Sequence, residues 1–181
     1  MRRNAKAVNF GIVYGISPFG LSQNIGVSQA ESKKYIDTFF EKFAAVRALM
    51  DRNIAEGKEK GYTTTILGRR RPIPELQSGD PAQRGFGERM AVNSPIQGSA
   101  ADLIKVAMIN VHKALHADLP HVKMILQVHD ELIFEVRRDH VHDVAHLVRS
   151  VMEGALALCV PLEVTAKSGD NWYDVEAMAD V

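Results

Sequence analysis

The chain has 181 residues, of which 46% are hydrophobic, and it contains 22 Lys+Arg and 22 Asp+Glu. This length supports one domain or two small lobes, and the absence of a signal peptide or a long apolar run predicts a cytoplasmic protein without a membrane partner. The single cysteine, Cys159, excludes an internal disulfide, and its apolar neighbours predict that it is buried.

The net charge of zero hides an uneven distribution along the chain. Residues 1–71 contain 13 basic and 6 acidic residues, whereas residues 72–181 contain 9 and 16, which gives formal charges of +7 and −7. The basic part favours binding of triphosphate or nucleic-acid backbone, and the acids of the other part can include a metal site. Unevenly charged but merely solvated surfaces are the simpler alternative.

Residues 1–15, MRRNAKAVNFGIVYG, carry two cations followed by two aromatic rings at a constant spacing of four. On a helix, Arg2, Lys6, Phe10 and Tyr14 share one face, with neighbours about 6 Å apart along the axis. Two cations one turn apart suit successive phosphates of a triphosphate, and the rings suit a sugar and a stacked base. The alternative is an ordinary amphipathic helix with its rings in a core.

Turn and cap residues divide the next part of the chain. Glycines and a proline over 15–20 predict a turn, which precedes a short helix over 21–25. Ser28 and Glu31 form a capping-box pattern that opens a further helix. Another helix is expected over about 45–60, ended by Gly61. The helix after the capping box carries four rings predicted to lie in the core, namely Tyr35, Phe39, Phe40 and Phe43.

The segment YTTTILGRRRPIP, residues 62–74, predicts a strand, a glycine turn and a returning strand. Its three arginines, Arg69, Arg70 and Arg71, lie at the turn, where phosphate contact and a solvated loop are both open. The stretch 74–83 contains two prolines, a glycine and several polar residues. We expect it to be a mobile link between two subdomains.

Residues 88–108, ERMAVNSPIQGSAADLIKVAM, follow a helical pattern that Ser94–Pro95 and Gly98 are expected to interrupt. Three polar side chains of this segment recur at a spacing of four, as in the first motif, and they are Arg89, Asn93 and Gln97.

Residues 123–136, KMILQVHDELIFEV, predict a tight β-hairpin with His129, Asp130 and Glu131 between two apolar strands. A carboxylate held at such a tip can bind Mg²⁺, which takes one or two protein carboxylates together with water and substrate phosphates. Asp130 is the predicted ligand, and an exposed acidic turn is the alternative.

After this hairpin, residues 139–158 have the spacing of a helix, and residues 162–166 alternate as a strand expected to join the hairpin's sheet. Two histidine pairs are one helical turn apart, but neither has the glutamate of an HExxH zinc motif, so we expect surface or packing histidines. These pairs are His112 with His116 and His142 with His146.

The three motifs, in this order, resemble those of family A DNA polymerases, the DNA polymerase I type, from Arg2 to about Trp172. The resemblance implies that Arg2 holds the outer phosphates of the nucleotide and that Lys6 holds the phosphate under attack. Phe10 would face the sugar, and Tyr14, followed by Gly15, would guard the template base.

The same resemblance assigns the later motifs to DNA and metal. Arg89, Asn93 and Gln97 match residues that touch the minor groove of the primer–template, where donors can contact every base pair regardless of sequence. Asp130 matches one of two metal-binding aspartates, with Glu131 as an auxiliary catalytic carboxylate. His129 would lie near the primer end.

The implied fold is α+β, a truncated polymerase "right hand" with a predominantly helical fingers lobe and a small antiparallel palm sheet backed by helices. Fingers would span 1–73, the mobile link 74–83 and a partial palm 84–181. The implied activity is DNA-templated DNA polymerisation with two Mg²⁺ ions, acting on primer–template DNA and dNTPs in a bacterial or phage-type cytoplasm. A single-subunit RNA polymerase and a non-catalytic DNA-binding module are the alternatives.

The family's other catalytic aspartate belongs to a strand motif upstream of the first helix, where this chain begins. Within the chain, Asp102 is the nearest substitute, but it falls inside a helical pattern. Because two-metal transfer needs carboxylates for both ions, we expect the isolated chain to be inactive unless a separately encoded upstream palm segment completes it.

Overall fold

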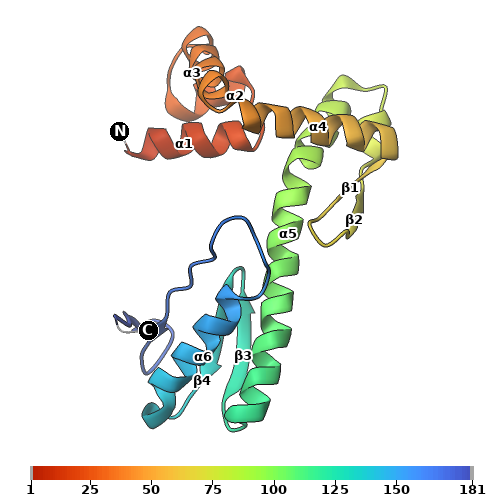
Figure 1. Cartoon of the computed structure of the whole chain (residues 1–181). Coiled ribbons are helices and arrows are strands. Elements are labelled where there is room, and N and C mark those ends of the chain that lie inside the picture. Colours follow the sequence, from red (N-terminus) through yellow and green to blue (C-terminus); the bar gives the residue numbers. More distant parts are fainter. Residues whose placement is uncertain (1, 180–181) are drawn as a thin grey trace. The chain divides into compact units, whose positions relative to one another are not determined.

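The computed structural model describes residues 2–179, with side chains described from Ala5 onward, and the chain forms two compact units that divide after Ser99. Its helices are α1 Arg2–Val13, α2 Pro18–Ile25, α3 Gln29–Lys42, α4 Ala44–Lys60, η1 Pro74–Gln77, α5 Pro81–Asp118, η2 Arg138–His140 and α6 Val141–Glu153 (Figure 1). Its strands are β1 Tyr62–Thr64, β2 Arg70–Pro72, β3 Lys123–Val128, β4 Glu131–Glu135, β5 Lys167–Ser168 and β6 Glu176–Ala177.

Within residues 2–179, the strands pair antiparallel as β1–β2, β3–β4 and β5–β6, each in a sheet of two strands. The excess of helix over these small sheets confirms the expected α+β class. Helix α5 begins in the first unit and continues into the second.

Helices α1, α2 and α3 lie side by side in the first unit (Figure 1). The Ser28 hydroxyl accepts a hydrogen bond of 3.2 Å from the Glu31 N–H, as the capping-box pattern predicts. Gly61 ends α4 with φ of +76°, a conformation in which glycine avoids the penalty of a Cβ. Ile12 of α1 and Leu21 of α2 are both buried.

The aromatic residues of α3 are only partly core, which corrects the expectation from sequence. Tyr35 and Phe43 are exposed, and Phe39 is half-buried. The Phe39 ring packs on those of Phe40 and Phe43, with centroids 5.6 and 4.9 Å apart, so these rings cover one another at the surface. The Tyr35 hydroxyl donates to Glu31 Oε1 at 2.8 Å, and this bond to a carboxylate raises the pKa of Tyr35.

The stretch 74–83 begins with η1, whose Leu76 is buried in a cluster with Ile73 and Ala91. A Cβ on Gly87 would lie 2.8 Å from the Leu76 backbone nitrogen, so η1 packs closely against α5. The whole stretch lies inside the first compact unit. Its mobility, and the division into fingers, link and palm, stay predictions.

Helix α5 runs without a break through Pro95, so the expected interruption at Ser94–Pro95 and Gly98 is wrong. The proline removes one backbone hydrogen bond. Contacts one turn later hold the helix in place: the Ser99 hydroxyl donates to the Pro95 carbonyl at 2.5 Å and accepts from the Ile66 N–H at 2.8 Å. Packing on the neighbouring hairpin therefore outweighs the local preference of the proline.

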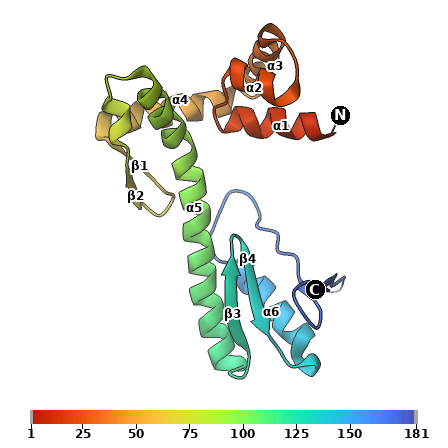
Figure 2. The same ribbon diagram turned by 180° about the vertical axis from the view of Figure 1, so that it is seen from behind.

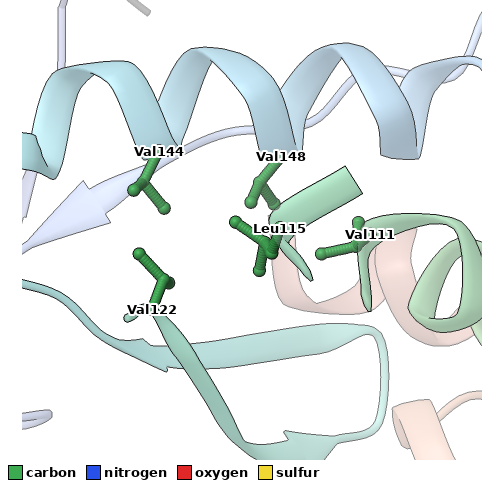
Figure 3. Packing of buried hydrophobic residues seen from close by; sticks show 5 residues of the cluster. All are labelled: Val111, Leu115, Val122, Val144 and Val148. Atoms are coloured by element: carbon green, nitrogen blue, oxygen red, sulfur yellow. The ribbon is translucent and has the colours of Figure 1, made fainter. Parts of the chain in front are cut away.

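The core of the second unit joins α5, Val122 just before β3, and α6 (Figure 3). Val144 and Val148 of α6 are four residues apart and face this core together, as the spacing of apolar residues predicts. The helix ends at Glu153, before the expected residue 158, where the Gly154 N–H bonds the Ser150 carbonyl. The buried residues of this core are Val111, Leu115, Val122, Val144 and Val148.

The expected strand over 162–166 is wrong, because these residues form no strand and join no sheet. The Val164 N–H donates instead to Glu153 Oε1 at 3.1 Å, which ties the segment to the end of α6. The first residue pair after it in a sheet is Lys167 with Ala177. The prediction that Cys159 is buried is also wrong, since α6 has already ended and the residue is exposed.

Candidate functional site

Helix α1 presents the first motif on an exposed face. Lys6, Phe10 and Tyr14 are all exposed, whereas Ile12 on another face of the helix is buried. The Phe10 and Tyr14 rings are stacked with centroids 6.4 Å apart and an angle of 19° between their planes. Two large rings with exposed fractions of 57% and 46% offer a platform for a planar ligand. The side chain of Arg2 lies outside the described residues.

The end of α1 meets α5. The Tyr14 N–H donates to the Phe10 carbonyl at the end of the helical hydrogen bonds. The next residue, Gly15, has φ of +76°, and this conformation turns the chain away from the helix. A Cβ on Gly15 would lie 3.4 Å from Cγ of Arg89, an ordinary van der Waals distance. The structure therefore brings the end of the first motif and the beginning of the second together within one unit.

Arg89, Asn93 and Gln97 follow one another on α5, each about 40° further round the helix. Arg89 and Gln97 are exposed and Asn93 is half-buried. Buried Ala91 and Val92 anchor this part of α5, so the three polar side chains extend from a fixed backbone. All three can donate hydrogen bonds at a spacing of about 6 Å per step.

Sequence reasoning missed Phe86 as a neighbour of this row. The guanidinium carbon of Arg89 lies 5.8 Å from the centroid of the Phe86 ring, whose exposed fraction is 50%. The attraction between cation and ring restrains Arg89 before any ligand binds. The spacing of three residues on a helix was the available signal, since such residues are neighbours.

The third motif forms the tip of the β3–β4 hairpin in the second unit. The predicted hairpin is confirmed, but Glu131 is the first residue of β4 and pairs with Val128, so the turn has only two residues, His129 and Asp130. His129 has φ of +53°, a region that few residues other than glycine adopt, although histidine is among the more tolerant. Such strain in the backbone is typical of functional sites.

Gln127 is a second residue that sequence reasoning missed. Its side-chain Nε2 donates to the His129 carbonyl at 2.5 Å, which closes the turn from the strand side. His129, Asp130 and Glu131 are all exposed, so their side chains are open to ligands. The adjacent carboxylates of Asp130 and Glu131 supply the hard oxygen donors that Mg²⁺ prefers.

Two other sequence expectations concern metals and membranes. Among residues 2–179, no group of three or more His, Cys, Asp and Glu side chains is placed to hold a metal ion. His112 and His116 are exposed and stack on one another with centroids 6.3 Å apart. None of the helices in this described part has the length and apolar character needed to cross a membrane.

Comparisons with known proteins agree on one family. The family model described as DNA polymerase family A matches residues 1–174. DNA polymerase I of Bacillus subtilis is 53% identical over 176 residues, and DNA polymerase I of Streptococcus pneumoniae is 51% identical over 175 residues. Each alignment covers 97% of this chain and 20% of the relative, so the chain spans about a fifth of the length of these curated relatives.

A solved structure gives the same result. The POL domain of Pol1 from M. smegmatis, in complex with DNA primer–template and dNTP, matches with a TM-score of 0.86 and 45% identity. The match covers 90% of this chain and 29% of that one. These matches are to DNA polymerases, which favours that family over the single-subunit RNA polymerases.

Proposed function

This chain belongs to DNA polymerase family A, and from that premise we propose that it carries nucleotide-binding and duplex-binding parts of an enzyme for DNA-templated DNA polymerisation. The reaction transfers a nucleotide from a dNTP to the 3′ hydroxyl of a primer and releases pyrophosphate, in replication or repair synthesis. Its partners are primer–template DNA and dNTPs, and DNA as substrate favours a cytoplasmic location in a bacterial or phage-type system.

The closeness of Gly15 to Arg89 is the observation that supports this proposal most strongly. It joins the row of α1 that suits a nucleotide to the row of α5 that suits a duplex, although the two are far apart in sequence. A polymerase needs this neighbourhood, because the incoming nucleotide pairs next to the last base pair of the duplex.

Helix α1 is the proposed nucleotide-binding element. Lys6 neutralises charge on the phosphate under attack and can donate a proton to the leaving pyrophosphate, since its exposed ammonium is open to ligands. Arg2 is proposed to hold the outer phosphates. The stacked rings of Phe10 and Tyr14 are proposed to face the sugar and the template base.

Helix α5 and the turn at His129 are the proposed contacts to the duplex. Arg89, Asn93 and Gln97 would donate to minor-groove acceptors, which occur at equivalent positions in every base pair. Such contacts respond to the shape of a pair and ignore its identity, as a copying enzyme requires. We propose that Gly15 turns the chain beside Arg89 at the duplex, and that His129 lies near the primer end.

Asp130 is the proposed Mg²⁺ ligand of this chain, with Glu131 as an auxiliary carboxylate. The exposed tip and its oxygen donors fit a hydrated ion that takes its remaining ligands from water and substrate phosphates. When bound, two such ions in the complete enzyme stabilise the attacking and leaving oxygens of phosphoryl transfer. The hydrogen bond from Gln127 to the His129 carbonyl fixes the backbone of the turn from which the Asp130 side chain extends.

The relatives are about five times as long as the matched segment. We therefore propose that polymerisation requires residues corresponding to the rest of their length, in the same chain or in a second one. A non-catalytic DNA-binding module is the second candidate, but such a module has no need of the cation at Lys6 or of the carboxylate at Asp130.

A chimaera tests the proposal. Residues 1–174 of this chain would replace the matching segment of the B. subtilis DNA polymerase I, and primer extension would be assayed with Mg²⁺ and all four dNTPs. We expect extension by the chimaera. A folded chimaera that binds primer–template but does not extend it would contradict polymerisation and favour the non-catalytic module.

A further inference from the structure

Figure 2 shows the β1–β2 hairpin beside α5, and hydrogen bonds from its backbone and side chains fasten it there. The Ile66 N–H donates to the Ser99 hydroxyl at 2.8 Å, and Arg69 Nη2 donates to the Gly98 carbonyl at 3.1 Å. A Cβ on Gly98 would come within 2.6 Å of Thr65 Cγ2, so the hairpin uses the space that this glycine leaves. The hairpin is therefore a fixed part of the first unit.

The hairpin is basic and contains no acidic residue. Residues 61–74 include three arginines and neither Asp nor Glu. Elsewhere in the first unit, four cations lie in ion pairs: Lys33 with Asp37, Arg47 with Asp51, Lys58 with Glu88 and Lys60 with Glu56. Arg70 and Arg71 are both exposed, and within residues 2–179 no carboxylate forms an ion pair with either of them.

Arg70 is held in position by Tyr62. The strand register pairs Thr64 with Arg70 and Tyr62 with Pro72, so Tyr62 and Arg70 are diagonal neighbours on one face of the hairpin. The guanidinium carbon of Arg70 lies 4.8 Å from the centroid of the Tyr62 ring. Stacking restrains the guanidinium plane and leaves its N–H edges free to bind an anion, with less entropy to lose on binding.

The place of the hairpin on α5 indicates which anion these arginines meet. Gly98 and Ser99 directly follow Gln97, and Gly98 lies about 100° round the helix from it. In the proposed function, Gln97 contacts the minor groove, which is about 6 Å wide and is bordered on each side by a line of phosphates. A basic hairpin on the flank of α5 beside that residue faces one of these lines.

We propose that the β1–β2 hairpin is a phosphate-binding element for duplex DNA, with Arg70 and Arg71 as the contacting cations. The assignment rests on the proposed function, because it needs α5 to lie along a duplex. It adds a backbone contact that positions the duplex and carries no sequence information.

Salt dependence of DNA binding by the 181-residue chain tests this proposal. Fluorescence anisotropy with a labelled primer–template duplex, over a range of KCl concentrations, gives the slope of log K against log [salt]. Each lost phosphate contact makes this negative slope shallower by about 0.9, so Arg70→Gln/Arg71→Gln should reduce its magnitude by about 2 and weaken binding roughly tenfold at low salt. Arg70→Lys/Arg71→Lys keeps both charges and should restore the slope.

A control pair separates local contact from the general effect of charge. Lys34→Gln/Arg52→Gln removes two exposed cations from α3 and α4 of the same unit, and it should leave the slope within about 0.5 of the unchanged chain. If the hairpin variant and the control give equal slopes, the hairpin proposal is wrong and the proposed function stands. If the unchanged chain does not bind the duplex at all, both fail.

Discussion

Gly15 and Arg89 are neighbours in the fold although 74 positions separate them in sequence: a Cβ on Gly15 would lie 3.4 Å from Arg89 Cγ. Gly15 also has φ of +76°, which sets the direction in which the chain leaves α1. The contact links the two rows of polar and aromatic side chains proposed to hold nucleotide and duplex.

Replacement of this glycine is the first prediction. Gly15→Ala should lower the free energy of unfolding by about 1 kcal/mol, because a residue with a Cβ is strained at positive φ. It should also weaken duplex binding, since the new methyl group limits the movement of Arg89. Urea denaturation and anisotropy with primer–template DNA measure the two effects.

Gly26 offers a matched control for Gly15. Its φ is +71°, but a Cβ there meets no atom within 4 Å. Gly26→Ala should therefore cost about the same free energy of unfolding and leave DNA affinity unchanged. Equal DNA affinities for the two variants would show that the contact with Arg89 has no part in binding.

The second prediction concerns the packing of the β1–β2 hairpin against α5 at Gly98. Gly98→Ala should destabilise the chain by about 1 to 3 kcal/mol, because the added methyl group would lie 2.6 Å from Thr65 Cγ2. Thr65→Ser removes that methyl and keeps the hydroxyl that accepts from the Arg69 N–H. The double variant should regain at least half of the lost stability, and strict additivity of the two changes would rule out this clash.

The third prediction concerns the pH dependence of stability that Glu153 contributes. The Val164 N–H and then Arg149 Nε donate to Glu153, and these bonds hold its pKa below the usual value. A carboxyl with a lower pKa in the folded state contributes stability above its unfolded pKa and loses it as pH falls through the folded pKa. Glu153→Gln should therefore lower the Tm most near neutral pH, with a difference that shrinks below about pH 4.

Exposed Glu163 supplies the control for this acid effect. Thermal melts of Glu163→Gln should match those of the unchanged chain at both neutral and acidic pH. A Glu153→Gln deficit that stays constant from neutral to acidic pH would mean that the charge of Glu153 does not stabilise the fold.

The sequence predicted elements whose signals are local. The Ser28–Glu31 cap, the glycine end of α4 at Gly61 and the hairpin around Asp130 all follow from a few neighbouring residues, and the structure confirms them. The Gly15 contact with Arg89 was not predictable in this way, because it depends on how two distant segments pack.

Two of the wrong predictions, the break at Pro95 and the strand around Val164, have the same cause. Pro95 signals a break, but the contacts of Ser99 and Gly98 with the β1–β2 hairpin keep α5 continuous. Val164 lies in a segment that alternates like a strand, yet its N–H bonds the Glu153 carboxylate and no sheet forms there. In each case a hydrogen bond to a residue outside the local segment decided the structure, and the local sequence pattern does not contain that residue.

The fourth prediction separates binding from chemistry in the chimaera with B. subtilis DNA polymerase I. Lys6→Ala should lower the maximal single-turnover rate about 100-fold or more, because the charge that Lys6 meets grows in the transition state. The Kd for primer–template should change less than about twofold. Lys34→Ala, which removes an exposed cation of α3, should change neither quantity.

Losses of equal size in rate and in duplex affinity would contradict this role of Lys6. They would indicate that the ammonium contacts the duplex rather than the phosphate under attack.

The most direct measurement is the single-turnover rate of primer extension by the same chimaera with Asp130→Asn, at saturating dNTP and Mg²⁺. Asparagine keeps the shape of the side chain and removes its charge, so the turn at His129 should persist and duplex affinity should be unchanged. The proposed function predicts a rate lowered by at least about 1000-fold. An unchanged rate would remove Asp130 from the metal site and would contradict the proposal that this hairpin takes part in nucleotide transfer.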